Sequence, residues 1–148
     1  LTYRRLATNR RLLVASATYA RSRGLPADPR DLKQHTCGVV REDEADVSLW
    51  SLSQRGRSAQ TVRVAPAFSS NDGEVVLQWV LSGMGIAERS EWSVSADLAA
   101  KRLVRVLPDW NLPDADIVAI LNPRTVRTAR AEALLQDLVA AFSGKEWN

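Results

Sequence analysis

The apolar positions at the start of the chain predict a strand that leads directly into a helix. Residues 1–16 contain two extended segments, and the second includes the continuous apolar run Leu12–Ala15, which is typical of a buried parallel strand. Ser16 is a good helix N-cap, and the segment from Thr18 to Gly24 predicts a short helix that ends at the glycine. A strand-to-helix unit therefore opens the chain.

Short elements separated by turn residues follow. Two prolines frame a turn and a brief helix over residues 31–33, and residues 37–41 predict a short strand. The segments 47–52 and 61–65 have the pattern of a hairpin, joined by a polar, flexible loop. We expect this hairpin to add an antiparallel edge to the sheet.

Helices and strands alternate in the rest of the chain. The polar residues 69–73 begin a helix whose apolar positions recur at helical spacing, namely Val75, Val76, Trp79 and Val80. A strand at 86–87, a helix at 93–100, a strand at 103–107 and a buried strand at 116–121 follow. Beyond Pro123, an amphipathic helix places on one face Ala131, Leu134, Leu135, Leu138 and Phe142. This order predicts an α/β fold with a mainly parallel sheet flanked by helices.

Composition places the chain among ordinary globular domains. Of its 148 residues, 45% are hydrophobic and 25% charged, and no apolar stretch approaches the length of a membrane span, so no membrane partner is expected. The single cysteine, Cys37, cannot form an internal disulfide, which fits a reducing cytoplasm. Because the chain opens on Leu1 and its one methionine is Met84, we expect that an upstream part has been removed.

The formal net charge of +3 is unevenly distributed. Residues 1–30 hold seven arginines and one acidic residue, which leaves 13 basic and 16 acidic residues in the remainder. A DNA-binding surface needs a concentrated basic face, usually on an element that enters a groove. The sequence contains no helix-turn-helix and no zinc-finger spacing. Direct contact of this region with DNA is therefore not expected.

Two short motifs are similar to a metal site and to a nucleotide-binding site, but neither has the full set of residues that such a site requires. His35 and Cys37 cannot supply the four ligands of a zinc site, and a surface histidine beside a buried cysteine is the simpler interpretation. Gly83 and Gly85 are similar to part of a dinucleotide fingerprint, but they follow a helix and enter a strand, which reverses the required order. We expect no metal, no cofactor and no enzymatic activity.

Two polar helix starts are the best candidates for ligand binding. Ser16 and Thr18 begin the first helix, and Ser69, Ser70 and Asn71 precede the second long one. The unpaired backbone N–H groups of a helix start can bind a carboxylate or another anion. The alternative is that these residues only cap their own helices. We hypothesise that the five residues form one site for a small organic anion.

The order of motifs resembles the effector-binding domain of LysR-type transcriptional regulators. The resemblance covers essentially the whole chain, and its motifs are Arg4–Ala7, Asn9–Ser16 with Tyr19, Pro29–Leu32 with His35, Ser69–Gly73, Gly83–Ala87, Leu103–Trp110 and the closing helix. Two departures concern the expected pocket. The family often has proline where this chain has Ala17, and Leu-Pro where it has Glu88 and Arg89.

The resemblance implies a two-lobed fold like that of type II periplasmic solute-binding proteins, with the effector between lobes joined by strands near Arg11–Ser16 and Ile117–Leu121. Residues 14–116 would form one complete lobe, and residues 1–13 and 117–148 the remainder of a truncated one. On this interpretation, we expect the family's DNA-binding winged helix-turn-helix to lie outside these 148 residues.

The resemblance therefore predicts the effector-sensing and oligomerisation region of a bacterial, cytoplasmic regulator. Such a protein self-associates as a dimer or tetramer and contacts DNA only through its N-terminal domain. Two alternatives remain: a periplasmic-type solute receptor, which an upstream export signal would favour, and a pure interaction module. A stabilising ligand would argue against the interaction module.

Overall fold

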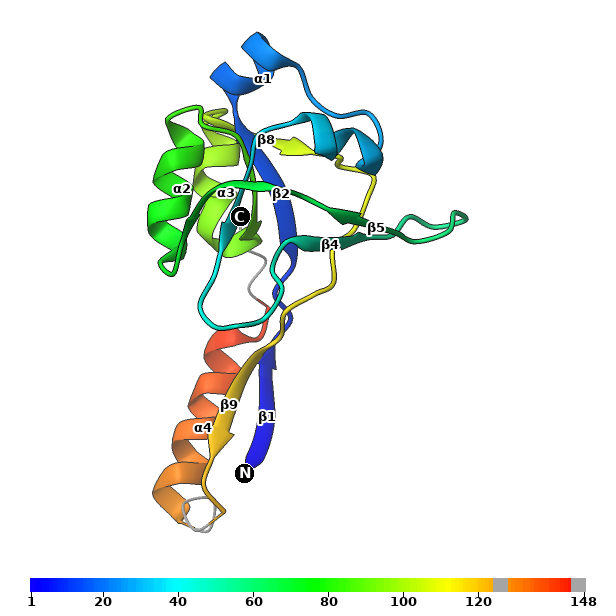
Figure 1. The fold of residues 1–148 in the computed structure, drawn as a ribbon. Helices are drawn as coiled ribbons and strands as arrows, with labels where there is room; N and C mark the ends of the chain where they lie inside the picture. Colours follow the sequence, from blue (N-terminus) through cyan, green and yellow to red (C-terminus); the bar gives the residue numbers. More distant parts are fainter. Residues whose placement is uncertain (124–127, 145–148) are drawn as a thin grey trace.

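The computed structural model describes residues 1–123 and 128–144 and contains a larger part and a narrow stem (Figure 1). The larger part is built on a five-stranded sheet, whereas the stem consists of two strands and one helix. Across the five-stranded sheet the order is β6 (Pro66–Ser70), β3 (Cys37–Val40), β7 (Ile86–Ser90), β2 (Arg11–Ser16) and β8 (Leu103–Val106).

The predicted α/β class is confirmed, with a sheet that is mixed rather than mainly parallel. Strand β3 is parallel to both β6 and β7, but β2 is antiparallel to both of its neighbours. Val14 of β2 pairs with Ala87 on one side and Arg105 on the other. The reason is the path of the chain: β2 enters from the stem and runs between β7 and β8 in the opposite direction.

Helices cover one face of this sheet. Helices α2 (Gly73–Leu81) and α3 (Glu91–Ala99) lie side by side there (Figure 1), and both contact β7. Their apolar residues pack with those of β2 and β7 in one core cluster that includes Val14, Val76 and Val94. Within the described residues, no helix has the length and hydropathy that a membrane span requires.

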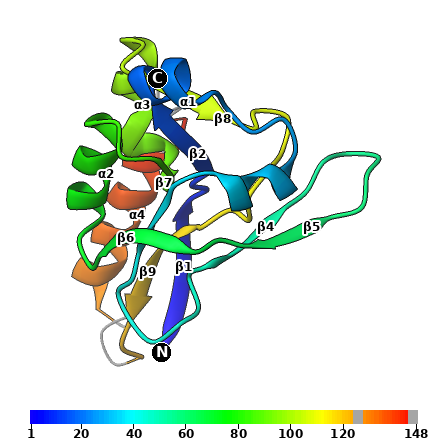
Figure 2. The same ribbon diagram turned by 45° about the horizontal axis from the view of Figure 1, so that its top comes forward.

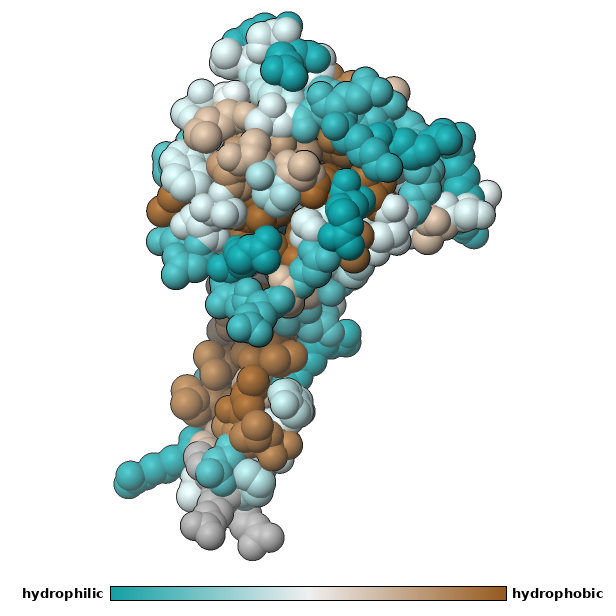
Figure 3. Space-filling model, viewed as in Figure 1, coloured by the Kyte–Doolittle hydropathy of each residue, from teal (hydrophilic) through white to brown (hydrophobic). Residues whose placement is uncertain are grey.

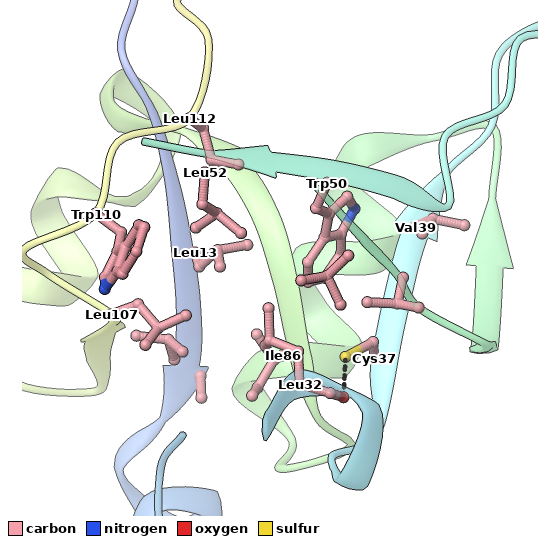
Figure 4. Packing of buried hydrophobic residues seen from close by; sticks show 14 of the residues in the cluster. Leu13, Leu32, Cys37, Val39, Trp50, Leu52, Ile86, Leu107, Trp110 and Leu112 are labelled. Atoms are coloured by element: carbon pink, nitrogen blue, oxygen red, sulfur yellow. Dashed lines mark hydrogen bonds between the residues drawn. The ribbon is translucent and has the colours of Figure 1, made fainter. Parts of the chain in front are cut away.

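The hairpin covers the other face. It consists of β4 (Leu49–Leu52) and β5 (Gln60–Arg63), and its tip projects away from the sheet (Figure 2). The predicted hairpin is confirmed, but it forms a sheet of its own rather than an edge of the larger one. The reason is that Trp50 and Leu52 point into a core with Leu13 and Ile86 (Figure 4), so the hairpin packs face to face with the sheet.

Two short helices complete the larger part. Helix α1 (Ala17–Arg23) follows β2 directly and ends at Gly24, whose φ of 71° suits a glycine. The 3-10 helix η1 (Pro29–Gln34) begins with a capping box between Asp28 and Asp31. Both elements lie where the sequence predicts them.

The stem pairs the first and last strands of the chain. Strands β1 (Thr2–Ala7) and β9 (Ile117–Leu121) are antiparallel, and helix α4 (Ala129–Phe142) lies along them (Figure 1). Leu135 of α4 is buried. The predicted burial of β9 is wrong, because Ile120 in this strand is 57% exposed. The α4 helix covers one face of this two-stranded sheet, and the other face lies open in the described structure.

Candidate functional site

The structure does not bring the five predicted site residues together. Ser16 is the last residue of β2 and Thr18 follows it in α1, whereas Ser69 and Ser70 end β6 and Asn71 follows them. Because β2 is antiparallel to β7, whereas β3 and β6 run parallel to it, these ends lie at opposite ends of the sheet. One ligand of metabolite size does not span both groups.

The first group caps its own helix. The buried Ser16 Oγ accepts a hydrogen bond of 2.9 Å from the backbone N–H of Tyr19 and so caps α1. Thr18 is exposed, and its Oγ1 accepts from Arg21 at 3.4 Å. Ser16 therefore has the structural role of an N-cap of α1.

The second group leaves the capping of α2 to its neighbour. Asp72 is the N-cap, and its carboxylate accepts from the backbone N–H of Glu74 at 2.8 Å. Ser70 Oγ accepts from the N–H of Asp72 at 3.1 Å, which fixes the turn into the helix. Ser69 and Asn71 are exposed at the same end of the sheet.

A pocket of about 500 Å³ opens at the end of the sheet where β2 begins and β7 ends. None of the five predicted residues lines it. Its walls come from the end of β3, the following loop, the start of the hairpin and the junction with the stem. Val39 and Trp50, which line the pocket, also belong to the buried cluster drawn in Figure 4. The charged lining residues are Arg11, Glu42, Asp43, Asp46, Glu88 and Arg89.

An ion pair crosses two strands at this pocket. Arg11 Nε lies against Glu88 Oε1, although no donor is aligned to make a regular hydrogen bond with that oxygen. The two residues are diagonal neighbours on one face, because Leu13 is directly opposite Glu88. Burial raises the pKa of the Glu88 carboxyl above its ordinary value, and the positive charge of Arg11 only partly offsets this effect.

Arg89 is on the opposite face of β7, towards α2. Its guanidinium lies so close to Gly73 that a Cβ there would be 2.2 Å from Nη1. Nη2 donates a long hydrogen bond of 3.4 Å to Ser93 Oγ, and Nε is buried without a partner. Burial lowers the pKa of Arg89, while the carboxylates of Glu74, Asp72 and Glu42 act in the opposite direction.

Hydrogen bonds of Asn9 hold the connection between the sheet and the stem beside the pocket. Asn9 is 4% exposed; its Nδ2 donates to Ser90 Oγ at 2.9 Å, and its carbonyl oxygen accepts from the N–H of Ala115 at 2.9 Å. Ser90 and Ala115 also line the pocket. Asn9 therefore connects both chain crossings to the end of β7, through its side chain to Ser90 and through its backbone carbonyl to Ala115, and a ligand in the pocket would lie beside these contacts.

Sequence reasoning found part of this pocket and missed the rest. Glu88, Arg89 and Ala17 were expected at the pocket because they depart from the family's usual residues. Glu88 and Arg89 line the pocket, and Ala17 does not. Sequence reasoning did not single out Arg11 or Asn9. An arginine at the start of a buried strand and an asparagine before it were the available signals.

The cysteine and histidine have structural surroundings. Cys37 is buried, burial raises the pKa of its thiol to about 12, and its Sγ donates weakly to the carbonyl of Leu32. His35 Nδ1 lies 2.8 Å from the hydroxyl of Tyr19. Over residues 1–123 and 128–144, no group of three or more histidine, cysteine or acidic side chains is arranged to hold a metal ion.

The mixed sheet flanked by helices has the type II periplasmic-binding-like α/β fold, as predicted. A family model, the LysR substrate binding domain, matches residues 1–143. The chain therefore belongs to the LysR substrate-binding domain family.

Relatives that are similar in sequence to this chain are transcriptional regulators. The chain is 36% identical over 140 residues to the HTH-type transcriptional regulator DmlR of Escherichia coli strain K12, covering 95% of this chain and 45% of that protein. It is 35% identical over 135 residues to the HTH-type transcriptional activator TtdR of the same strain, covering 91% and 43%. The chain thus spans less than half the length of these relatives.

Solved structures of other regulators have the same fold. CrgA from Neisseria meningitidis superposes with a TM-score of 0.83 at 23% identity, over 97% of this chain and 48% of that one. The regulatory domain of the C227S variant of AphB from Vibrio vulnificus gives a TM-score of 0.80 at 24% identity, over 95% and 69%.

Proposed function

We propose that this chain is the effector-sensing and oligomerisation region of a cytoplasmic LysR-type transcriptional regulator. It binds a small organic anion and performs no covalent chemistry. DNA is contacted by another part of the regulator, as the name HTH-type of its longer relatives suggests. Membership of the substrate-binding domain family supports the sensing role.

The pocket at the junction is the single observation that carries this proposal. It lies at the end of the sheet that contains the C-terminal ends of β3, β6 and β7, which is the usual position for ligands in open α/β sheets. Its volume of about 500 Å³ suits a metabolite. Two arginines, Arg11 and Arg89, supply donors for an anion.

The position of the pocket also suggests how binding is transmitted. Arg11, Ser90 and Ala115 line it, and the same segments connect the sheet to the stem through Asn9. A ligand that binds one orientation of the stem better than another shifts the population towards that orientation. In an oligomer, such a shift changes the spacing of the parts that contact DNA.

Thermal unfolding with a panel of small acids, amines, sugars and aromatic compounds tests the proposal. A ligand at a hundredfold excess over its Kd should add about 2.7 kcal/mol of stability. We expect stabilisation by at least one acid. Stabilisation only by cations or uncharged compounds would show that the proposed anion site is wrong.

A further inference from the structure

Arg89 is a largely buried cation whose charge no neighbouring carboxylate pairs directly. Within the described part of the chain, no ion pair of 4.0 Å or less involves Arg89, whereas the other arginine of the pocket, Arg11, is paired with Glu88. The Arg89 Nε atom is buried and has no hydrogen-bond partner. Buried donors are nearly always paired in folded proteins, so this group lacks an acceptor.

The acidic residues of the pocket do not fill that role. Glu88 is engaged by Arg11, and Asp46 accepts a hydrogen bond of 2.8 Å from Arg63. Glu42 and Asp43 are exposed on the loop after β3, where water screens their charge. Glu74, Asp72 and Glu42 act on Arg89 electrostatically, but among the described residues none of them forms an ion pair with it, so its charge has no direct partner at the pocket.

We propose that Arg89 is the residue that binds the carboxylate of the effector and so determines specificity for an organic anion. This inference rests on the effector-binding function proposed above and adds to it the residue that selects the ligand. A guanidinium presents two parallel N–H donors to a carboxylate, which gives both affinity and orientation. A ligand carboxylate would pair the charge of the guanidinium, which no carboxylate of the described residues pairs directly.

Gly73 has a definite part in this arrangement. A Cβ at this position would lie 2.2 Å from Nη1 and 2.7 Å from Nη2 of Arg89, so the guanidinium can occupy its place only beside a glycine. Gly73 has no positive φ and is the first residue of α2, where alanine is a better helix former. Gly73→Ala should therefore keep the helix and the net charge while it displaces the guanidinium.

The test compares carboxylates with their neutral amides. Thermal unfolding and calorimetric titration are performed with acetate, succinate and benzoate, and with acetamide, succinamide and benzamide. We expect at least one acid to stabilise the wild-type chain more than its amide does. Arg89→Gln and Gly73→Ala should each weaken binding of that acid by about tenfold to a hundredfold, the range expected for loss of one or two charge-assisted hydrogen bonds. Arg57→Gln, an equal change of charge in the exposed hairpin loop, should leave it unchanged.

The outcomes separate the two proposals. If an acid binds the wild-type chain and both pocket variants equally, Arg89 is not the anchor, although the anion-binding function stands. If amides stabilise as well as acids, or if no acid stabilises, both proposals are wrong. Should Arg89→Gln fail to fold, the comparison of Gly73→Ala with Arg57→Gln decides the question.

Discussion

The Glu88 carboxylate and the Arg11 guanidinium form an ion pair between β7 and β2, with the Glu88 side chain only 15% exposed and the Arg11 side chain 44% exposed. The desolvation cost of folding therefore differs between the two side chains. Arg11 keeps much of its hydration, whereas Glu88 loses most of its own, and this loss is why the pKa of Glu88 is raised despite the pairing.

Glu88→Gln should change the pH dependence of stability. A carboxyl group with a raised pKa in the folded state binds its proton more tightly there than in the unfolded chain. Its contribution to stability is therefore greatest below its ordinary pKa of 4.5 and is lost as the pH rises towards the raised value. In urea unfolding from pH 4 to 7, the free energy of unfolding of Glu88→Gln, relative to wild type, should rise with pH. A difference that stays constant or falls would contradict this assignment.

Leu135→Ala tests how the stem is held together. Leu135 is 3% exposed and Leu134 is 60% exposed, although they are neighbours on α4. Truncation of the buried leucine should lower the free energy of unfolding by about 2–3 kcal/mol, the lower part of the usual range, because a two-stranded sheet can relax around the gap. Leu134→Ala is the matched control, with an expected change within about 0.5 kcal/mol. Equal effects in urea unfolding would show that α4 does not dock as described.

Hydrophobic pattern was sufficient to predict most elements, because local spacing carries that information. The apolar run Leu12–Ala15 lies in β2, as predicted. Val76 and Val80, which recur at helical spacing, lie on the buried face of α2. Strand β6 was not predicted. It begins at Pro66 and buries only Phe68, which packs where Gly38 leaves room for its ring, so its pairing with β3 depends on a distant residue.

The site was harder to predict because it depends on strand direction. Ser16 and Ser70 each end a strand, and in a parallel sheet both would lie at the same edge. Because β2 runs the other way, its beginning rather than its end meets the end of β7, and Arg11 rather than Ser16 reaches the pocket. No local pattern in residues 11–16 encodes that direction, since it is set by the connection to the stem.

Cys37 should be inert towards thiol reagents in the folded protein. Its thiol is buried and its pKa is raised to about 12, so at pH 8 only about one molecule in ten thousand carries the reactive thiolate. We expect labelling by a chromogenic disulfide reagent to be at least about a hundredfold slower in the native state than in 8 M urea. Rapid labelling of the native protein would contradict the burial of this side chain.

The open face of the stem should mediate self-association. Tyr3 and Ile120 are directly paired on β1 and β9, and Val118 is two residues from Ile120 on the same face; they are 65%, 57% and 41% exposed. Apolar side chains gather along the stem (Figure 3), and an exposed apolar patch of this kind favours contact with another apolar surface.

Ile120→Lys should therefore weaken self-association of the chain in sedimentation experiments. A lysine at the centre of this face would have to lose its hydration on contact, which opposes association without disturbing α4, because Leu135 packs on the opposite face. Leu25→Lys, a similar change at a partly exposed leucine after α1, is the control and should leave the sedimentation profile as it is. If the wild-type chain sediments as a monomer at every concentration, or if both variants behave alike, the stem face is not an association surface.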